Sequence, residues 1–234
     1  MRGLFITGTD TDIGKTFVTD LIARQLLAEG AATGIYKPAC SGVETDGTGL
    51  KSWSDVEAHY ETLNGDFERD RICPQCFEAP AAPPVAASLE NRDVDSSLMQ
   101  AGLNWWADRV EFLLVEGVGG WLCPLTKTTS IADFAQECGY PVLIVASRVL
   151  GTLNHTLLTI ESVRARNLPI VGIVLNQNLA PTGTIAEHSN LRELTRLTNV
   201  PVLSSVEFGQ HKMLRRVASA DTIDWIELID TSVN

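Results

Sequence analysis

The first thirty residues restrict the folds open to this chain more than any other segment. A short apolar stretch, Leu4 to Thr7, is followed by GTDTDIGKT at residues 8–16. Residues 15–29 then carry apolar side chains at helical spacing, and Gly30 ends the pattern. A strand, a glycine-containing turn and a helix in this order are typical of a phosphate-binding loop, although this one is one residue longer than the common pattern.

The rest of the chain alternates between apolar strands and helical segments. Strands are expected at 33–36, 112–116, 142–146, 170–175 and 202–203. Helices are expected at 54–63, from Asp95 or Ser96 to 107, and at 131–138, 153–166, 185–198 and 222–229. Residues 38–54 and the proline-rich 72–88 are predicted to be irregular loops. Residues 1–234 are thus predicted to form a single-domain α/β fold of the P-loop NTPase type. Its sheet is doubly wound and mostly parallel, with helices on both faces.

Charge and composition exclude several classes of function. The net charge is −11 and no cluster of Lys and Arg is present, which argues against a nucleic-acid surface. No membrane-spanning or secretory segment is visible, so a cytoplasmic protein is expected. Five cysteines are an odd number, which favours reduced thiols. Cys73 and Cys76 form a C-x-x-C without a second pair, so two packed thiols are expected rather than a zinc or redox site.

Residues 14–16 carry the chemistry expected of a phosphate-binding loop. Their amides lie at a helix N-terminus, where unpaired N–H groups and the helix dipole favour anions. Lys15 is expected to reach the β- and γ-phosphates, and the Thr16 hydroxyl is expected to bind Mg²⁺. The alternative is a capped helix start with an incidental Lys-Thr pair.

Two carboxylates are candidates to complete a magnesium site. Glu116 ends the strand FLLVE, at the edge of the sheet where ligands bind in parallel α/β folds. The following Gly117, Gly119 and Gly120 would let the backbone approach a phosphate. The alternative for Glu116 is a strand-end carboxylate that faces water. Asp55 is a weaker candidate, because it could simply be an acidic residue in the first turn of a helix.

Two further strand ends carry polar groups. Lys37 could neutralise charge on a transferring phosphoryl group or an anionic substrate, or it could be a surface lysine. Asn176 has an amide that could read a purine edge, or it could be a turn residue. The histidines show no metal-ligand spacing and are interpreted as structural or solvent-exposed: His59, His155, His188 and His211.

Four motifs together resemble the dethiobiotin synthetase family over most of the chain. GTDTDIGKT is similar to the extended loop of that family. Tyr36-Lys37-Pro38 with Ser41-Gly42 resembles its second motif, VEGVGGW at 115–121 its third, and LGTLNH at 150–155 its fourth. The resemblance implies a ligase that uses Mg²⁺ and ATP to convert 7,8-diaminopelargonic acid and CO₂ into a cyclic urea. The reaction would pass through a carbamate and its mixed anhydride with phosphate.

The resemblance also implies roles for individual residues. Lys37, Lys15 and Thr11 would be catalytic, and Mg²⁺ would bind Thr16, Asp55 and Glu116. The diamine would contact Thr11, Lys37, Ser41, Gly151, Thr152 and Asn154. Because the last three would come from a neighbouring subunit, the resemblance implies a homodimer. The nucleotide would contact Asp12, Ile13, Gly14, Lys15, Thr16, Phe17, Asp55, Glu116, Gly117, Val118, Gly119, Asn176, Gln177, Glu207 and Phe208.

The main alternative is a switch ATPase of the partitioning or septum-positioning kind, which shares this fold. Those proteins carry a lysine early in the loop, and residues 7–11 contain none. They also tend to have a membrane helix or a basic patch, and neither is visible in this sequence. The sequence therefore favours the synthetase interpretation.

Overall fold

A six-stranded sheet forms the centre of the molecule. The computed structural model describes residues 1–210 and 214–232. Every strand pair in this sheet is parallel, and the order is β10-β9-β8-β1-β7-β2. Its strands are β1 (Arg2–Gly8), β2 (Thr33–Tyr36), β7 (Phe112–Glu116), β8 (Val142–Ser147), β9 (Ile170–Asn176) and β10 (Val202–Val206). The strands are almost entirely buried, as expected for a parallel sheet covered on both faces.

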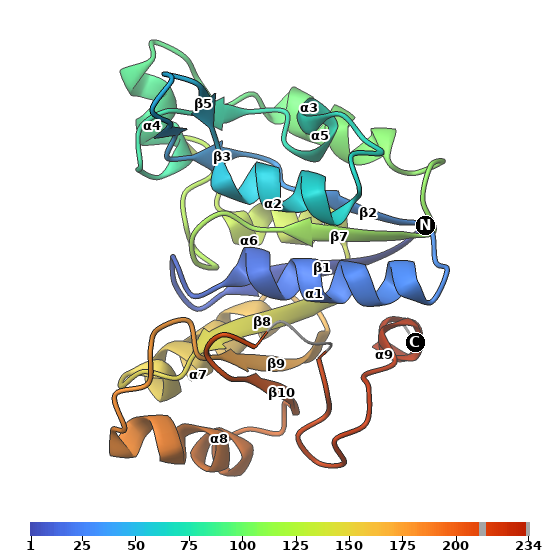
Figure 1. Cartoon of the computed structure of the whole chain (residues 1–234), viewed down its shortest axis with the longest axis vertical. Coiled ribbons are helices and arrows are strands. Elements are labelled where there is room, and N and C mark those ends of the chain that lie inside the picture. The colour runs from blue at the N-terminus through green and yellow to red at the C-terminus, as the bar shows by residue number, and fades with distance from the viewer. Residues whose placement is uncertain (211–213, 233–234) are drawn as a thin grey trace.

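Helices cover both faces of the sheet. The longer ones are α1 (Lys15–Ala28), α2 (Ser54–Thr62), α5 (Ser96–Trp105), α6 (Ile131–Cys138), α7 (Thr152–Arg164), α8 (Ile185–Leu197) and α9 (Trp225–Ser232). Figure 1 shows α1 in front of the sheet and α6 behind it. The predicted doubly wound α/β fold of the P-loop NTPase type is confirmed. No helix in the described part of the chain is long and apolar enough to cross a membrane.

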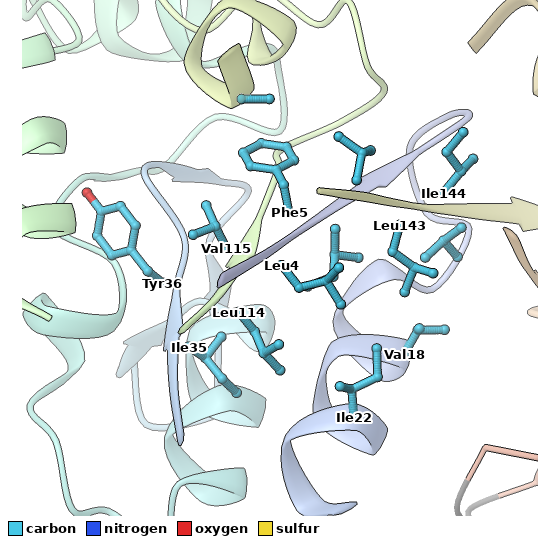
Figure 2. Close-up of a cluster of buried hydrophobic side chains, with 14 of the residues drawn as sticks. Leu4, Phe5, Val18, Ile22, Ile35, Tyr36, Leu114, Val115, Leu143 and Ile144 are labelled. Carbon is cyan, nitrogen blue, oxygen red and sulfur yellow. The ribbon is translucent and has the colours of Figure 1, made fainter. Parts of the chain in front are cut away.

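Alternate residues of a strand pack against opposite helix layers. In Figure 2, Leu4 lies on the side of α1, near Val18 and Ile22, and Phe5 points to the other side. The Phe5 ring packs edge-on against Phe134 of α6, with ring centroids 6.4 Å apart. Because both faces of β1 are buried, the strand reads as a continuous apolar run and not as an alternating one.

Two segments that the sequence predicts as loops contain short regular elements. Residues 38–54 contain β3 (Cys40–Ser41), β4 (Glu44–Thr45) and β5 (Lys51–Ser52). The prediction of an irregular segment at 72–88 is wrong in part, because it contains β6 (Cys76–Phe77) and α4 (Pro83–Leu89). A proline at the first helical position needs no N–H partner and already has a helical φ, so the proline-rich sequence starts a helix here. A short helix, α3 (Arg69–Ile72), precedes β6.

The small β3–β6 pair positions one wall of the candidate site. Ser41 lies opposite Phe77 in this pair. The indole N–H of Trp53, the residue just before α2, donates to the Phe77 carbonyl oxygen at 2.9 Å. The same short element therefore fixes Ser41 and the first turn of α2, where Asp55 lies.

Candidate active site

The loop between β1 and α1 requires glycine at position 14. Gly14 has φ +90°, in the left-handed region that favours glycine. A Cβ atom there would lie 2.1 Å from Nδ2 of Asn176. The Lys15 ammonium donates to the Asp10 carbonyl oxygen at 3.1 Å, so this side chain folds back over the loop. The strand, turn and helix predicted for a phosphate-binding loop are all present.

Side chains from β8 and from the end of β9 hold the loop. Asn176 donates to the Ile13 carbonyl oxygen at 2.8 Å, and Asn178 donates to that of Asp12 at 2.7 Å. Ser147 in turn donates to the side-chain oxygen of Asn178 at 2.9 Å. Asn176 therefore uses an amide hydrogen to support the loop, and contact with a purine base stays a prediction. Asn178 and Ser147 are supporting residues that the sequence analysis missed.

Lys37 lies between two carboxylates. Its Nζ is 2.6 Å from Oε1 of Glu116 and 2.7 Å from Oδ2 of Asp55. Lys37 is 2% exposed and Glu116 is fully buried. The alternatives of a surface lysine and of a strand-end carboxylate facing water are therefore wrong. The ends of β2 and β7 meet the first turn of α2 at this point, which brings three residues from distant parts of the sequence together.

The Thr16 hydroxyl joins the same cluster. Its Oγ1 lies 2.8 Å from Oδ1 of Asp55 and 2.9 Å from Oε1 of Glu116. A hydroxyl has one proton, so it can donate to only one carboxylate at a time. Two carboxylates and a hydroxyl converging in this way are hard oxygen donors of the kind that Mg²⁺ prefers. The donor set therefore fits the metal. Within the described residues, no group of three or more His, Cys, Asp or Glu side chains could hold a metal by itself.

Mutual electrostatic stabilisation keeps the buried groups charged. Burial alone would lower the pKa of Lys37, but the Glu116 and Asp55 carboxylates hold it well above its ordinary value. Burial alone would raise the pKa of Glu116, and Lys37 and His59 hold it well below its usual range. The pKa of Asp55 is lowered by Lys37 against the same effect of burial. Lys15 differs, because burial and then Lys37 lower its pKa.

His59 is a buried structural histidine, as one of its two interpretations had it, and it belongs to this cluster. The ring is fully buried, with Nδ1 2.7 Å from Oδ1 of Asp20 and Nε2 3.2 Å from Oε2 of Glu116. Burial lowers the pKa of His59, but the Glu116 and Asp20 carboxylates outweigh burial and raise it to about 9. His155 lines a neighbouring cavity, and His211 lies outside the described residues.

The raised pKa of His59 predicts a pH-dependent contribution to stability. The stabilisation is fully present below the ordinary pKa of 6.5 and is lost as the pH rises through about 9. A shift of this size corresponds to roughly 3 kcal/mol in the free energy of unfolding. Urea unfolding of the metal-free chain at pH 6.5 and 9, compared with His59→Gln at the same values, measures it. A difference between the two proteins that does not change with pH would contradict this prediction.

Many of the predicted site residues line one cavity of about 530 Å³. Phosphate-loop, strand-end and helix residues contribute to it: Thr11, Asp12, Gly14, Lys15, Thr16, Phe17, Lys37, Ser41, Asp55, Val118 and Gly119. Cys40 also lines this cavity, although the sequence analysis did not select it. A second cavity of about 370 Å³ also includes Thr11 and continues to His155 and Leu158 of α7. The two cavities therefore share Thr11 of the loop.

Other predicted residues do not line the first cavity. The side chain of Ile13, a residue of the loop, is buried, and Gly117 packs against Ile131 of α6. The residues at the start of α7, proposed to contact the diamine, lie outside both cavities: Gly151, Thr152 and Asn154. Within one copy of the chain, these three positions are therefore not brought to Lys37.

The remaining positions selected for nucleotide contact follow the carboxyl ends of β9 and β10. Glu207 follows β10 and forms an ion pair with Arg148, which follows β8, at 2.5 Å. Phe208 is half exposed, at 53%. Gln177 is buried and donates to the Leu179 carbonyl oxygen at 3.0 Å. Contact of these residues with a nucleotide stays a prediction.

The two cysteines of the C-x-x-C pair pack against each other. Cys73 and Cys76 are free thiols whose sulfurs lie 3.7 Å apart. They pack with Cys40 and Val56 in a small apolar cluster. This agrees with the interpretation of two packed thiols.

Comparison with known proteins identifies relatives over most of the chain. The family model described as "AAA domain" matches residues 2–211. The ATP-dependent dethiobiotin synthetase BioD of Halalkalibacterium halodurans is 37% identical over 89% of this chain and 86% of its own. The BioD of Anaeromyxobacter sp. is 43% identical over 85% of this chain and 86% of its own. BioD 1 of Escherichia coli K12 is 33% identical over 86% of this chain and 88% of its own.

Solved structures add only a distant likeness. A ParA family ATPase from Chlorobium tepidum is 12% identical, with a TM-score of 0.49 over 88% of this chain and 83% of its own. The sequence relatives, in contrast, are above 30% identical over more than four fifths of the chain. The chain therefore belongs to the family of ATP-dependent dethiobiotin synthetases, which are ligases.

Proposed function

We propose that this protein makes dethiobiotin from 7,8-diaminopelargonic acid, CO₂ and ATP. One amine of the diamine takes up CO₂ to form a carbamate. The carbamate oxygen attacks the γ-phosphorus of ATP, which gives a carbamic-phosphoric anhydride and ADP. The second amine then attacks the anhydride carbon, closes the cyclic urea and expels phosphate. The family relationship supports this chemistry, and the observation that carries it is Lys37 held between Glu116 and Asp55 beside the phosphate loop.

Lys37 and Lys15 would act through charge and position rather than as nucleophiles. Phosphoryl transfer needs its reactants held in line and the charge on the transferring group neutralised. Lys37 is fixed by two ion pairs at one wall of the cavity, and Lys15 lies on the loop itself. Thr11, which lines the same cavity, would hydrogen-bond the carbamate, and Ser41 would contact the diamine.

Mg²⁺ would be held by Thr16, Asp55 and Glu116, and when bound it would neutralise phosphate charge. The protein's own contribution is to keep both carboxylates ionised, which the lowered pKa values of Asp55 and Glu116 support. Lys37 serves as their counter-ion in the structure described above. The nucleotide base would lie on the side of Asn176, Gln177 and the end of β10.

A homodimer would complete the diamine site. Gly151, Thr152 and Asn154 do not reach the Lys37 cavity within one chain, so a second copy would have to supply them. The surface around them is apolar: Leu150 is 86% exposed, Leu122 58% and Leu158 56%. Burying such side chains is what stabilises subunit contacts.

The proposed function is tested by measuring ADP release with Mg-ATP and bicarbonate, with and without 7,8-diaminopelargonic acid. We expect release to depend strongly on the diamine, with one dethiobiotin formed for each ADP. ATP hydrolysis that is indifferent to the diamine would instead support the switch ATPase alternative. Mass spectrometry of the product separates a cyclic urea from an uncyclised carbamate.

A further inference from the structure

A buried chain of polar groups leads from Glu116 through His59 to Asp20. Oδ1 of Asp20, on α1, lies 2.7 Å from Nδ1 of His59, on α2. Nε2 of the same ring lies 3.2 Å from Oε2 of Glu116, at the end of β7. His59 and Glu116 are fully buried and Asp20 is 6% exposed. Asp20 and His59 lie outside the four sequence motifs, and the proposed reaction does not use them.

The two oxygens of Glu116 face different partners. Oε1 lies near Lys37 and Thr16, in the cluster beside the phosphate loop. Oε2 lies on the far side, 3.2 Å from Nε2 of His59, in an ion pair whose angles do not meet hydrogen-bond geometry. A carboxylate with donors on only one side can rotate about its last bond, whereas partners on both sides define its plane.

Helix geometry places the supporting groups directly behind the site. Thr16 and Asp20 are four residues apart on α1, and Asp55 and His59 are four residues apart on α2. Residues at this spacing lie one above the other on the same helix face. Each helix therefore supplies one group to the phosphate side of Glu116 and one to its opposite side.

We propose that Asp20 and His59 form a positioning pair that holds the Glu116 carboxylate in the orientation needed to bind a magnesium–nucleotide complex. Asp20 fixes the imidazole ring through Nδ1, and the ring directs Nε2 at Oε2 of Glu116. Oε1 is then kept facing Thr16 and Lys37. The inference rests on the proposed function only in assigning Glu116 to the magnesium–nucleotide site.

Two substitutions of His59 separate its two contacts. The amide nitrogen of glutamine reaches about as far as Nε2 of histidine, and that of asparagine about as far as Nδ1. His59→Gln therefore retains a donor toward Glu116, and His59→Asn retains only the donor toward Asp20. The readout is calorimetric binding of a non-hydrolysable ATP analogue at a series of Mg²⁺ concentrations, together with binding in EDTA.

For His59→Asn, we expect the Mg²⁺ concentration for half-maximal analogue binding to rise about 10- to 100-fold, as for other groups that orient metal ligands. Binding in EDTA should not change. His59→Gln should stay close to the parent. The matched control is Gln25→Met, which removes a buried polar group of α1 that bonds Ile223 and Trp225 away from the site. It should lower stability and leave the Mg²⁺ response unchanged.

The proposal would be overturned if the parent and His59→Asn needed the same Mg²⁺ concentration for half-maximal analogue binding. It would also be overturned if Gln25→Met raised this concentration as much as His59→Asn does. If His59→Asn does not fold, Asp20→Ala replaces it in the experiment. Asp20 lines the cavity and is not in the fully buried interior, and its loss removes the partner that fixes the His59 ring. An unshifted Mg²⁺ response there would also overturn the proposal. The binding readout does not need the diamine, so a parent chain that makes no dethiobiotin would contradict the proposed function alone.

Discussion

Replacing Lys37 with alanine should preserve nucleotide binding and lower turnover by a factor on the order of 10²–10³. The ammonium group lies between Glu116 and Asp55 at the wall of the cavity, where it is almost inaccessible to water. An ammonium group that is already fixed does not have to move when negative charge develops on the transferring phosphoryl group. Nucleotide binding should depend mainly on the loop at residues 8–16, whereas Lys37 forms its ion pairs with Glu116 and Asp55.

The experiment on Lys37 compares turnover number and nucleotide affinity in one preparation. Lys51→Ala is a suitable control, because Lys51 is a half-exposed lysine in an ion pair with Glu78. Parent-like turnover in Lys37→Ala would remove this residue from the mechanism. The substitution also leaves two buried or half-buried carboxylates without their lysine, which typically costs about 3–5 kcal/mol. Unfolding must therefore be measured beside turnover, so that a loss of folded protein is not mistaken for a loss of catalysis.

The sequence predicted the main sheet and its helices well, because both follow from local patterns. The ends of the predicted strands and longer helices differ from the observed ones by three residues or fewer. The terminal helix was expected at 222–229 and is found at Trp225–Ser232, where Asp224 accepts from the amide of Glu227. The prediction for the proline-rich segment at 72–88 was wrong in part, because proline breaks the interior of a helix but suits its first turn.

The site was predictable where its residues end strands, and less so where helices supply them. Parallel strands all end at one edge of the sheet, so Lys37 and Glu116 could be expected to meet. Asp55 was a weak candidate by pattern alone, because the packing of α2 against α1 is not visible in local sequence. His59 was missed, yet its position four residues after Asp55 is a signal that it shares the same helix face.

Glu116→Gln should greatly weaken the dependence of activity on Mg²⁺, although the side chain keeps its shape. The substitution removes one negative charge from the cluster of Thr16, Asp55 and Lys37 and replaces one carboxylate oxygen with an amide group. Groups that only orient metal ligands are worth about 10- to 100-fold in affinity. Loss of a ligand charge should therefore raise the Mg²⁺ concentration for half-maximal activity at least about tenfold.

One control variant, Glu57→Gln, separates this effect from a general loss of acidic charge. Glu57→Gln neutralises a partly exposed carboxylate on the same helix as Asp55, in an ion pair with Arg69, and should leave the magnesium response unchanged. Glu116→Gln also takes from Lys37 its shorter ion pair, so turnover at saturating Mg²⁺ should stay below that of the parent. If turnover recovers fully at high Mg²⁺, Glu116 binds the metal without helping to fix Lys37. If the response matches the parent at every Mg²⁺ concentration, Glu116 is not a ligand, and its buried carboxylate serves Lys37 and His59 alone.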